Sequence, residues 1–113
     1  MRRGEIWTVA GSKDYAGKPR PAVLIQDDRF DATESITVCP LTTNLTDAPL
    51  LRLAVEPSAR NGLRVVSRAM VDKITTVPKS RIGRQIGRLS DEDITRLNRA
   101  VVVFLGLAGA GGR

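Results

Sequence analysis

Short strand-like segments, separated by clusters of Gly, Pro and polar residues, run through most of this chain and constrain its fold more than any other feature. Their apolar and β-branched residues either alternate with polar ones or form brief apolar runs, as the strands of a curved sheet do. We predict strands at residues 5–10, 21–26, 36–41 and 50–55, one or two more within 63–77, and a half-exposed edge strand at 83–89. Single helical turns are expected around Arg29 and Phe30 and after Pro78. About six short strands with frequent turns indicate a small barrel or a strongly curved sheet.

The clearest single element is a C-terminal helix that begins after Ser90. The Ser90 hydroxyl can cap the helix, and the acidic residues 91–93 in the first turn favour its macrodipole. Apolar residues that we expect to pack on the sheet recur at helical spacing: Ile94, Leu97, Val101, Phe104 and Leu105. Gly106 is expected to end the helix and residues 106–113 to form a flexible tail. The fold class is therefore α+β, mainly β, in one domain of residues 1–113.

The absence of histidine excludes several kinds of enzyme. It removes the usual general base at neutral pH, the usual zinc ligand and every Ser-His or Cys-His pair. The only cysteine, Cys39, cannot close an intramolecular disulfide, and its place in a β-branched strand predicts an inert core residue. An enzyme built from this chain must work with carboxylates, Arg, Lys, hydroxyls and backbone N–H groups, and only a carboxylate site for a hard cation stays open.

No segment is long and apolar enough to span a membrane, and the charged N-terminus lacks the apolar run of a secretory signal. A lone reduced cysteine fits a reducing compartment. We therefore expect a soluble cytoplasmic protein.

The net charge of +6 comes from the second half of the chain. Residues 1–59 carry seven basic and eight acidic side chains, whereas residues 60–99 carry ten basic and four acidic ones. Such clustering is typical of proteins that bind nucleic acid or an acidic protein partner, because each cation that neutralises a phosphate releases a counterion. A solvated basic face without a partner is the alternative.

Three groups of polar residues are candidates for chemistry. Arg20 lies between Pro19 and Pro21, which stiffen its backbone and suit its guanidinium to clamping a phosphate; a plain surface arginine is the alternative. The segment 42–44, Thr-Thr-Asn, follows a predicted buried strand and is either part of a groove or a simple turn. Asp72 interrupts an apolar run and is expected to be paired, with Lys73 or Arg68 as the simplest partner.

The loop before Arg20 holds a second set of candidates. Tyr15 lies between Lys13 and Lys18, and an aromatic ring flanked by positive charge is how single-stranded nucleic acids are often stacked. An ordinary loop tyrosine is the equal alternative.

Five sequence blocks occur in order along nearly the whole chain, from Arg3 to about Leu107. They are Arg3-Gly-Glu-Ile-Trp7, Lys18-Pro-Arg-Pro-Ala-Val-Leu-Ile25, Val38-Cys-Pro-Leu-Thr-Thr-Asn44, Met70-Val-Asp-Lys-Ile-Thr-Thr-Val77 and Ile86-Gly-Arg-Leu-Ser90. Together these blocks resemble the MazF/PemK/Kid family, the endoribonuclease toxins (mRNA interferases) of bacterial type II toxin–antitoxin pairs. The resemblance implies an SH3-like (CcdB/Kid-like) barrel with a C-terminal helix, which forms a homodimer and binds single-stranded RNA in a groove.

The resemblance also implies the reaction. Members cleave RNA at short sequences without a metal or other cofactor, by attack of the ribose 2′-hydroxyl on the adjacent phosphorus. The products are a 2′,3′-cyclic phosphate and a 5′-hydroxyl end, and a chain without histidine can perform this reaction because the substrate supplies the nucleophile. The partner implied is an acidic, MazE-like antitoxin that occupies the RNA groove, and we expect its binding to be tight and salt-sensitive.

Site residues carried over from the resemblance are as follows. Arg20 would stabilise the phosphorane, Thr42 would hold the scissile phosphate, and Asp72 would orient Arg20 or act on the 2′-hydroxyl. The family's Gln-Ile-Arg-Thr run reads Lys73-Ile-Thr-Thr76 here, and Met70 stands where some members have Arg. The expected RNA contacts are Lys13, Tyr15, Lys18, Thr43, Asn44, Arg68 and Lys73.

Two other functions stay open at this point. The related CcdB family shares the barrel and helix but poisons DNA gyrase without cutting nucleic acid. A chain with the substitutions near Asp72 could also be an inactive scaffold that only binds its partner.

Overall fold

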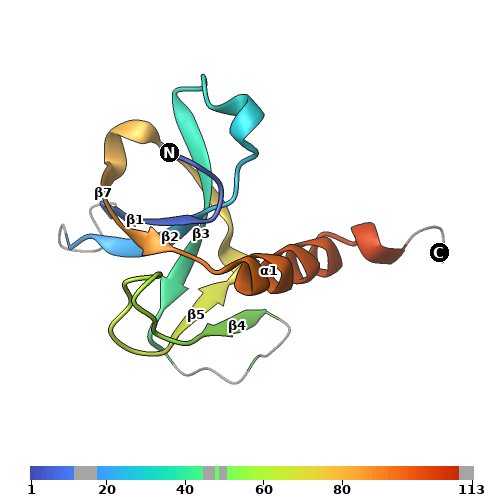
Figure 1. The fold of residues 1–113 in the computed structure, drawn as a ribbon. Coiled ribbons are helices and arrows are strands. Elements are labelled where there is room, and N and C mark those ends of the chain that lie inside the picture. Colours follow the sequence, from blue (N-terminus) through green and yellow to red (C-terminus); the bar gives the residue numbers. More distant parts are fainter. Residues whose placement is uncertain (12–17, 45–47, 49–50, 110–113) are drawn as a thin grey trace.

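The computed structural model describes residues 1–11, 18–44, 48 and 51–109, and within them an antiparallel sheet curves around two apolar clusters with one helix beside it (Figure 1). The strands are β1 (Glu5–Val9), β2 (Arg20–Leu24), β3 (Ser35–Thr42), β4 (Arg52–Val55), β5 (Ser67–Met70), β6 (Thr75–Pro78) and β7 (Ile82–Arg88), and the helix is α1 (Asp91–Phe104). Short 3₁₀ turns lie at η2 (Asp28–Phe30), η3 (Val71–Lys73), η4 (Lys79–Arg81) and η5 (Leu107–Gly109). The α+β, mainly β prediction is confirmed.

The long strand β3 joins two parts of the sheet. Its first half, residues 35–38, pairs with β6, and its last two residues pair with β5. The strand order is therefore β4-β5-β3-β2-β1-β7, with β6 also paired to β3. Among the described strands β7 pairs with β1 alone and lies at an edge, as its charged and apolar alternation predicts.

The two faces of the curved sheet bury separate apolar clusters. On β2, Val23 belongs to the cluster under α1, whereas its neighbours Ala22 and Leu24 belong to the second cluster, enclosed by β1, β2, β3 and β6. This division follows from the alternation of side chains along a strand. Cys39 is fully buried in the first cluster, and burial raises the pKa of its thiol to about 12. The prediction of an inert core cysteine is confirmed.

Two strand predictions were wrong in part. Residues 63–66 are not in a strand, because the turn before them continues past Gly62: the side-chain oxygen of buried Asn61 accepts hydrogen bonds from the backbone N–H groups of Ser58 and Leu63. Residues 71–73 form η3 instead of continuing a strand. This turn is needed because β5 and β6 pair with opposite ends of β3, so the chain must change direction between them.

The helix begins as predicted, with the Ser90 hydroxyl accepting a hydrogen bond from the backbone N–H of Asp93 at 3.1 Å. The helix packs on the sheet from Ile94 to Val101, and Leu97 in this stretch is buried at 1% exposure. The prediction that Phe104 and Leu105 pack on the sheet was wrong: they are 44% and 57% exposed, because the end of α1 projects beyond the sheet (Figure 1). Gly106 ends the helix at a φ of 76°, η5 follows, and the last part of the expected tail, 110–113, lies outside the described residues.

Candidate functional site

Arg20 and Thr42 lie at the same end of two neighbouring antiparallel strands. Arg20 is the first residue of β2 and Thr42 the last residue of β3. In the register of these strands Ala22 pairs with Pro40, and its continuation by two residues leads to Arg20 and Thr42. Paired residues of an antiparallel sheet point to the same face, so both side chains belong to one face at one sheet end. The structure thus brings together two residues that are 22 positions apart in the sequence.

The Thr42 side chain is fixed by a local turn. Its Oγ1 accepts a hydrogen bond from the backbone N–H of Asn44 at 3.1 Å. The hydroxyl proton is then free to point elsewhere, because a hydroxyl can accept and donate at once. Thr43 and Asn44, which the sequence suggested as binding residues, are both exposed beside it.

Arg68 is the neighbour of Thr42 on the other side. It lies on β5, where it pairs with Thr42 in the ladder. Its Nε is buried and has no hydrogen-bond partner among the described residues. A buried N–H donor of this kind is costly unless a polar group reaches it, and it marks this end of the sheet as a place for an acceptor. The predicted contact of Arg68 with RNA stays a prediction.

Asp72 forms an ion pair with Arg52 of β4, a residue that the sequence analysis did not select. Arg52 donates from Nε to Oδ1 at 3.0 Å and from Nη2 to Oδ2 at 3.2 Å, and the two side chains are 14% and 24% exposed. The expected pairing of Asp72 with Lys73 or Arg68 was therefore wrong. The signal for Arg52 was the alternation of its strand, which places it opposite Met70 on the face of Arg68.

The pKa of Asp72 lies below its ordinary value of 3.8. Burial raises this pKa, but hydrogen bonds from Arg52 and from the Asp72 backbone, with the charges of Arg52 and Lys73, outweigh burial. A carboxylate with a lowered pKa in the folded state stabilises the protein above its unfolded-state pKa, and this stabilisation is lost as the pH falls through the folded-state pKa.

We therefore expect Asp72→Asn to destabilise the protein at neutral pH and to flatten its acid dependence. The loss of the charged hydrogen bonds, with Arg52 left unpaired, should cost about 2 kcal/mol at pH 7, and the difference from the wild type should shrink below about pH 4. Urea unfolding from pH 3 to pH 7 measures this difference. A constant gap across that range would contradict the role given to the ion pair, and Asp91→Asn at the exposed start of α1 is the matched control.

A cavity of about 270 Å³ opens beside Arg20. It contains Lys73, as the sequence suggested for the site, and Arg81, which the sequence analysis missed. Arg81 lies in η4, and the only sequence signal for it was its membership of the basic half of the chain. A second cavity of about 440 Å³ contains Thr43 with Arg64 and Arg84.

Other predicted binding residues are placed only in part. Lys18 is exposed two residues before Arg20. Lys13 and Tyr15 lie outside the described residues. Among the described residues no cluster of three or more acidic or cysteine side chains is arranged to hold a metal ion.

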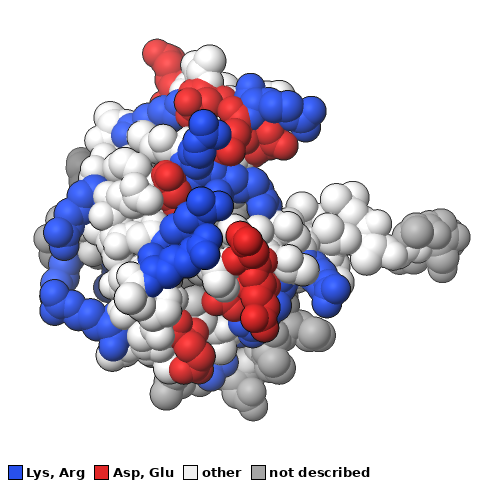
Figure 2. Space-filling view, in the orientation of Figure 1, with Lys and Arg blue, Asp and Glu red and all other residues white. Residues whose placement is uncertain are grey.

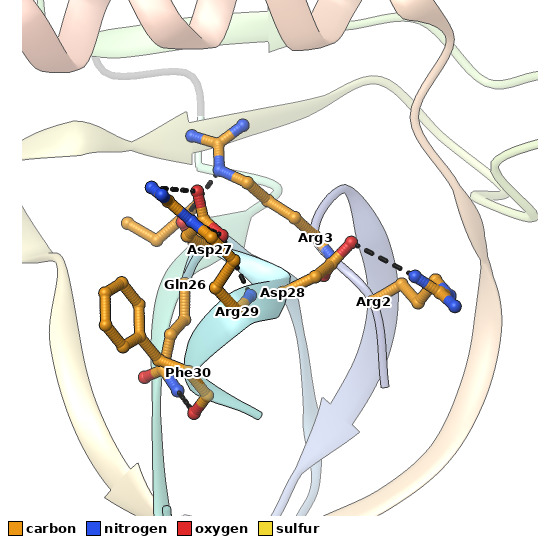
Figure 3. A network of polar contacts seen from close by, with 8 residues as sticks. Arg2, Arg3, Gln26, Asp27, Asp28, Arg29 and Phe30 are labelled. Carbon is orange, nitrogen blue, oxygen red and sulfur yellow. Dashed lines mark hydrogen bonds and ion pairs between the residues drawn. The ribbon is translucent and has the colours of Figure 1, made fainter. Parts of the chain in front are cut away.

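Asp27 and Asp28, in the first half of the chain, each form an ion pair with a neighbouring arginine. Around η2, Arg29 pairs with Asp27 at 3.1 Å and Arg2 with Asp28 at 3.5 Å, while the Arg3 guanidinium donates to the Ile25 carbonyl (Figure 3). The hydrogen bonds from Arg29 hold the pKa of Asp27 below its usual value. This network fixes the N-terminus to the η2 turn and leaves little charge for a partner there.

The basic residues of the second half are mostly not neutralised. Of the ten between residues 60 and 99, Arg60, Lys79 and Arg96 form ion pairs. The other seven form none with the described residues: Arg64, Arg68, Lys73, Arg81, Arg84, Arg88 and Arg99. In Figure 2, Lys and Arg run along the left edge and across the middle of this face, whereas Asp and Glu gather near the top, over η2, and at the start of α1. The excess charge of this chain is thus available on its surface.

Comparison with known proteins gives a consistent result. The family model described as "PemK-like, MazF-like toxin of type II toxin-antitoxin system" matches residues 2–105. A relative from Mycolicibacterium smegmatis named "Probable endoribonuclease MazF" is 57% identical over 109 residues, which is 96% of this chain and all of that protein.

Solved structures agree with the family match. The Mycobacterium tuberculosis toxin MazF-mt6 superposes with a TM-score of 0.73 at 27% identity, covering 88% of this chain and 93% of the other. A mycobacterial endoribonuclease solved in complex with its cognate antitoxin shares the fold, with a TM-score of 0.76 at 23% identity over 95% of this chain and 96% of the other.

Proposed function

This chain belongs to the family of PemK-like, MazF-like toxins of type II toxin–antitoxin systems, and from this premise we propose that it is a toxin that cleaves single-stranded RNA. The observation that carries the proposal is the placement of Arg20 and Thr42 at one sheet end, in a chain 57% identical to a protein named probable endoribonuclease. The cationic surface around this end supplies the charge that an RNA strand requires.

The proposed reaction uses the substrate's own nucleophile. The ribose 2′-oxygen forms a bond to the adjacent phosphorus and loses its proton, while the bond from phosphorus to the 5′-oxygen of the next nucleotide breaks and that oxygen gains a proton. The products are a 2′,3′-cyclic phosphate and a 5′-hydroxyl end. Because nucleophile and phosphorus are already joined by the ribose, proximity supplies much of the rate, and no metal or other cofactor is required in this scheme.

The protein has to stabilise the charge that develops on phosphorus. The Arg20 guanidinium presents N–H donors in a planar fork. This fork can donate one hydrogen bond to each of two phosphate oxygens. The Thr42 hydroxyl, held by Asn44, can donate to the same phosphate. Arg68 pairs with Thr42 in the neighbouring strand, and its guanidinium carries further N–H donors.

We assign Asp72 a positioning role. Both of its oxygens are engaged by Arg52, and this ion pair ties η3 to β4. The next residue, Lys73, lies in the cavity beside Arg20. Asp72 therefore holds Lys73 in place, and we do not assign it a direct action on the 2′-hydroxyl because both of its oxygens already accept hydrogen bonds from Arg52.

Cleavage of a long natural RNA by the purified protein tests the proposed function. We expect cuts at one short recurring sequence, seen by sequencing the new ends. Random degradation, or intact RNA at any protein concentration, would contradict the proposal. The gyrase-binding alternative gains no support from the relatives, whose names are those of endoribonucleases. The inactive scaffold remains the alternative that this experiment excludes.

We also propose that two copies of the chain form a homodimer through the free end of α1. Residues 100–112 carry no charge, and the side chains of Val103, Phe104, Leu105 and Leu107 are 44–68% exposed. Apolar side chains in such a row are unusual on a monomer surface. Each chain has a net charge of +6, and two copies repel each other least where they meet through an uncharged segment such as this one.

Phe104→Glu is expected to shift the protein from dimer to monomer. A carboxylate at this position would be buried without a partner in the dimer, which is strongly unfavourable. Analytical ultracentrifugation at micromolar concentration gives the mass, and Asn98→Glu on the exposed side of the same helix should leave the dimer intact. Equal masses for the wild type and Phe104→Glu would rule out this interface.

The second proposed partner is a cognate acidic, MazE-like antitoxin. Its flexible acidic segment would lie on the unpaired cations of residues 60–99, which attract a polyanion of either kind. No helix in the described part of the chain is long and apolar enough to cross a membrane. Because bacterial RNA is made and translated in the cytoplasm, we propose that the toxin acts there.

A further inference from the structure

The cavity beside Arg20 has an apolar floor and a cationic rim. Its floor is formed by side chains of the second apolar cluster, among them Val9, Ala22, Val38 and Val77. Its rim carries Arg20, Lys73 and Arg81, which reach it from β2, η3 and η4. Three separate elements therefore point positive charge toward one apolar hollow.

The size of the cavity limits what it can hold. Its volume of about 270 Å³ is just below the roughly 300 Å³ at which pockets for drug-sized ligands begin. A single flat ring fits this space, whereas a folded peptide or a large cofactor does not. An apolar floor with charges only at the rim is what a nucleobase attached to a phosphate requires, because the ring is apolar on its faces and the phosphate is anionic.

The charged side chains that line the cavity are hydrogen-bond donors. Arginine and lysine donate hydrogen bonds and accept none, and among the described lining side chains only the Thr75 hydroxyl and the weakly accepting sulfur of Met70 can accept one. None of the described lining residues has a carboxylate or an amide in its side chain. A carbonyl oxygen at position 4 of a pyrimidine or position 6 of a purine, as in uracil and guanine, can accept from these donors, whereas the amino group at the same position of cytosine and adenine would face N–H groups.

We propose that this cavity is a base-binding subsite that selects a keto base, uracil or guanine, in the RNA strand next to the cleaved bond. The inference rests on the proposed function and adds a specificity-determining site to it. Arg20 belongs both to the cavity and to the proposed phosphate site, so the base enters the cavity from the nucleotide that carries the scissile phosphate or from its immediate neighbour. Lys73 and Arg81 hold the base edge and the flanking phosphate.

Two adjacent residues of β6 give a matched pair of test variants. Thr75 lines the cavity and pairs with Val38 of its floor. Thr76 points to the opposite face, where its hydroxyl shares a hydrogen bond with Thr37 at 2.7 Å. Both are exposed, and aromatic residues are well tolerated in strands, so phenylalanine at either place is compatible with folding. Thr75→Phe blocks the mouth of the cavity, and Thr76→Phe leaves it open.

The readout is base preference in a pool of RNA with randomised sequence, obtained by sequencing the cut ends. The wild type should prefer uridine or guanosine over cytidine or adenosine by about tenfold or more at one position adjacent to the cut, since good hydrogen-bonded pairs discriminate by at least that factor. Thr75→Phe should lose this preference and cut more slowly, and Thr76→Phe should keep it. Arg81→Ala should weaken the preference without abolishing cleavage.

The outcomes separate the subsite from the proposed function. If the wild type cuts RNA but shows no keto preference, or if Thr75→Phe retains it, the subsite is wrong and the endoribonuclease stands. If the wild type cuts no RNA, the subsite is decided by titrating UMP, GMP, CMP and AMP and following the backbone amide signals of Ala22 and Val38. UMP and GMP should shift these signals at about tenfold lower concentration than CMP and AMP, and equal responses would overturn the proposal.

Discussion

Arg20→Ala is expected to cut RNA at least about a hundredfold more slowly than the wild type, the loss seen when one donor to a developing oxyanion is removed. The reason is the position of Arg20 at the start of β2, on the cationic rim and beside the end of β3. Single-turnover cleavage with enzyme in excess measures this loss directly, because product release then does not limit the rate.

The controls for this prediction separate charge from geometry. Arg20→Lys keeps the positive charge but lacks the planar fork, and should recover only part of the rate. Arg29→Ala removes an exposed arginine in η2 that lies outside the basic half of the chain and outside both cavities, and it should cut at the wild-type rate. Unchanged cleavage by Arg20→Ala would remove Arg20 from the reaction and leave the site to be found elsewhere.

The second large effect is expected from the substrate. An RNA with a 2′-deoxyribose on the 5′ side of the cleaved bond should not be cut at that bond, even after long incubation, because the nucleophile is missing. The effective concentration of a neighbouring hydroxyl reaches roughly 10⁵ M or more, so no ordinary residual rate from water replaces it.

Binding provides the control for the deoxy substrate. It should bind with nearly the affinity of the all-ribose RNA, since phosphates supply most of the binding energy. Cleavage of the deoxy substrate at the same bond would mean that water or a protein group is the nucleophile, and the mechanism would have to be replaced.

The parts of the fold that follow from local patterning could be predicted from the sequence. The strand around Val23, the 3₁₀ turns at η2 and η4, and the cap at Ser90 are each set by neighbours within a few residues. The turn at residues 71–73 could not be predicted, because it depends on β5 and β6 pairing with different ends of β3, which is a long-range property. The exposed Phe104 was missed for a related reason: helical periodicity identifies an apolar face but not whether the sheet is long enough to cover it.

The candidate site divides in the same way. Arg20 and Thr42 were identified through the resemblance of their sequence blocks, and the strand register then explains why they belong together. Arg52 and Arg81 were missed, because their surroundings are built from parts of the chain that are distant in the sequence: Arg52 pairs with Asp72, and Arg81 lines a cavity to which five strands contribute. The roles of all these site residues stay predictions, and Lys13 and Tyr15 also lie outside the described residues.

The chemistry of the RNA ends tests the central claim most directly. A short RNA that contains the preferred sequence is incubated with the purified protein in EDTA, and the products are analysed by mass spectrometry and by labelling with polynucleotide kinase. We expect cleavage in EDTA, a 2′,3′-cyclic phosphate on the upstream fragment, and a 5′-hydroxyl that accepts phosphate without prior treatment. A 5′-phosphate with a 3′-hydroxyl, or cleavage that requires an added metal ion, would contradict the account.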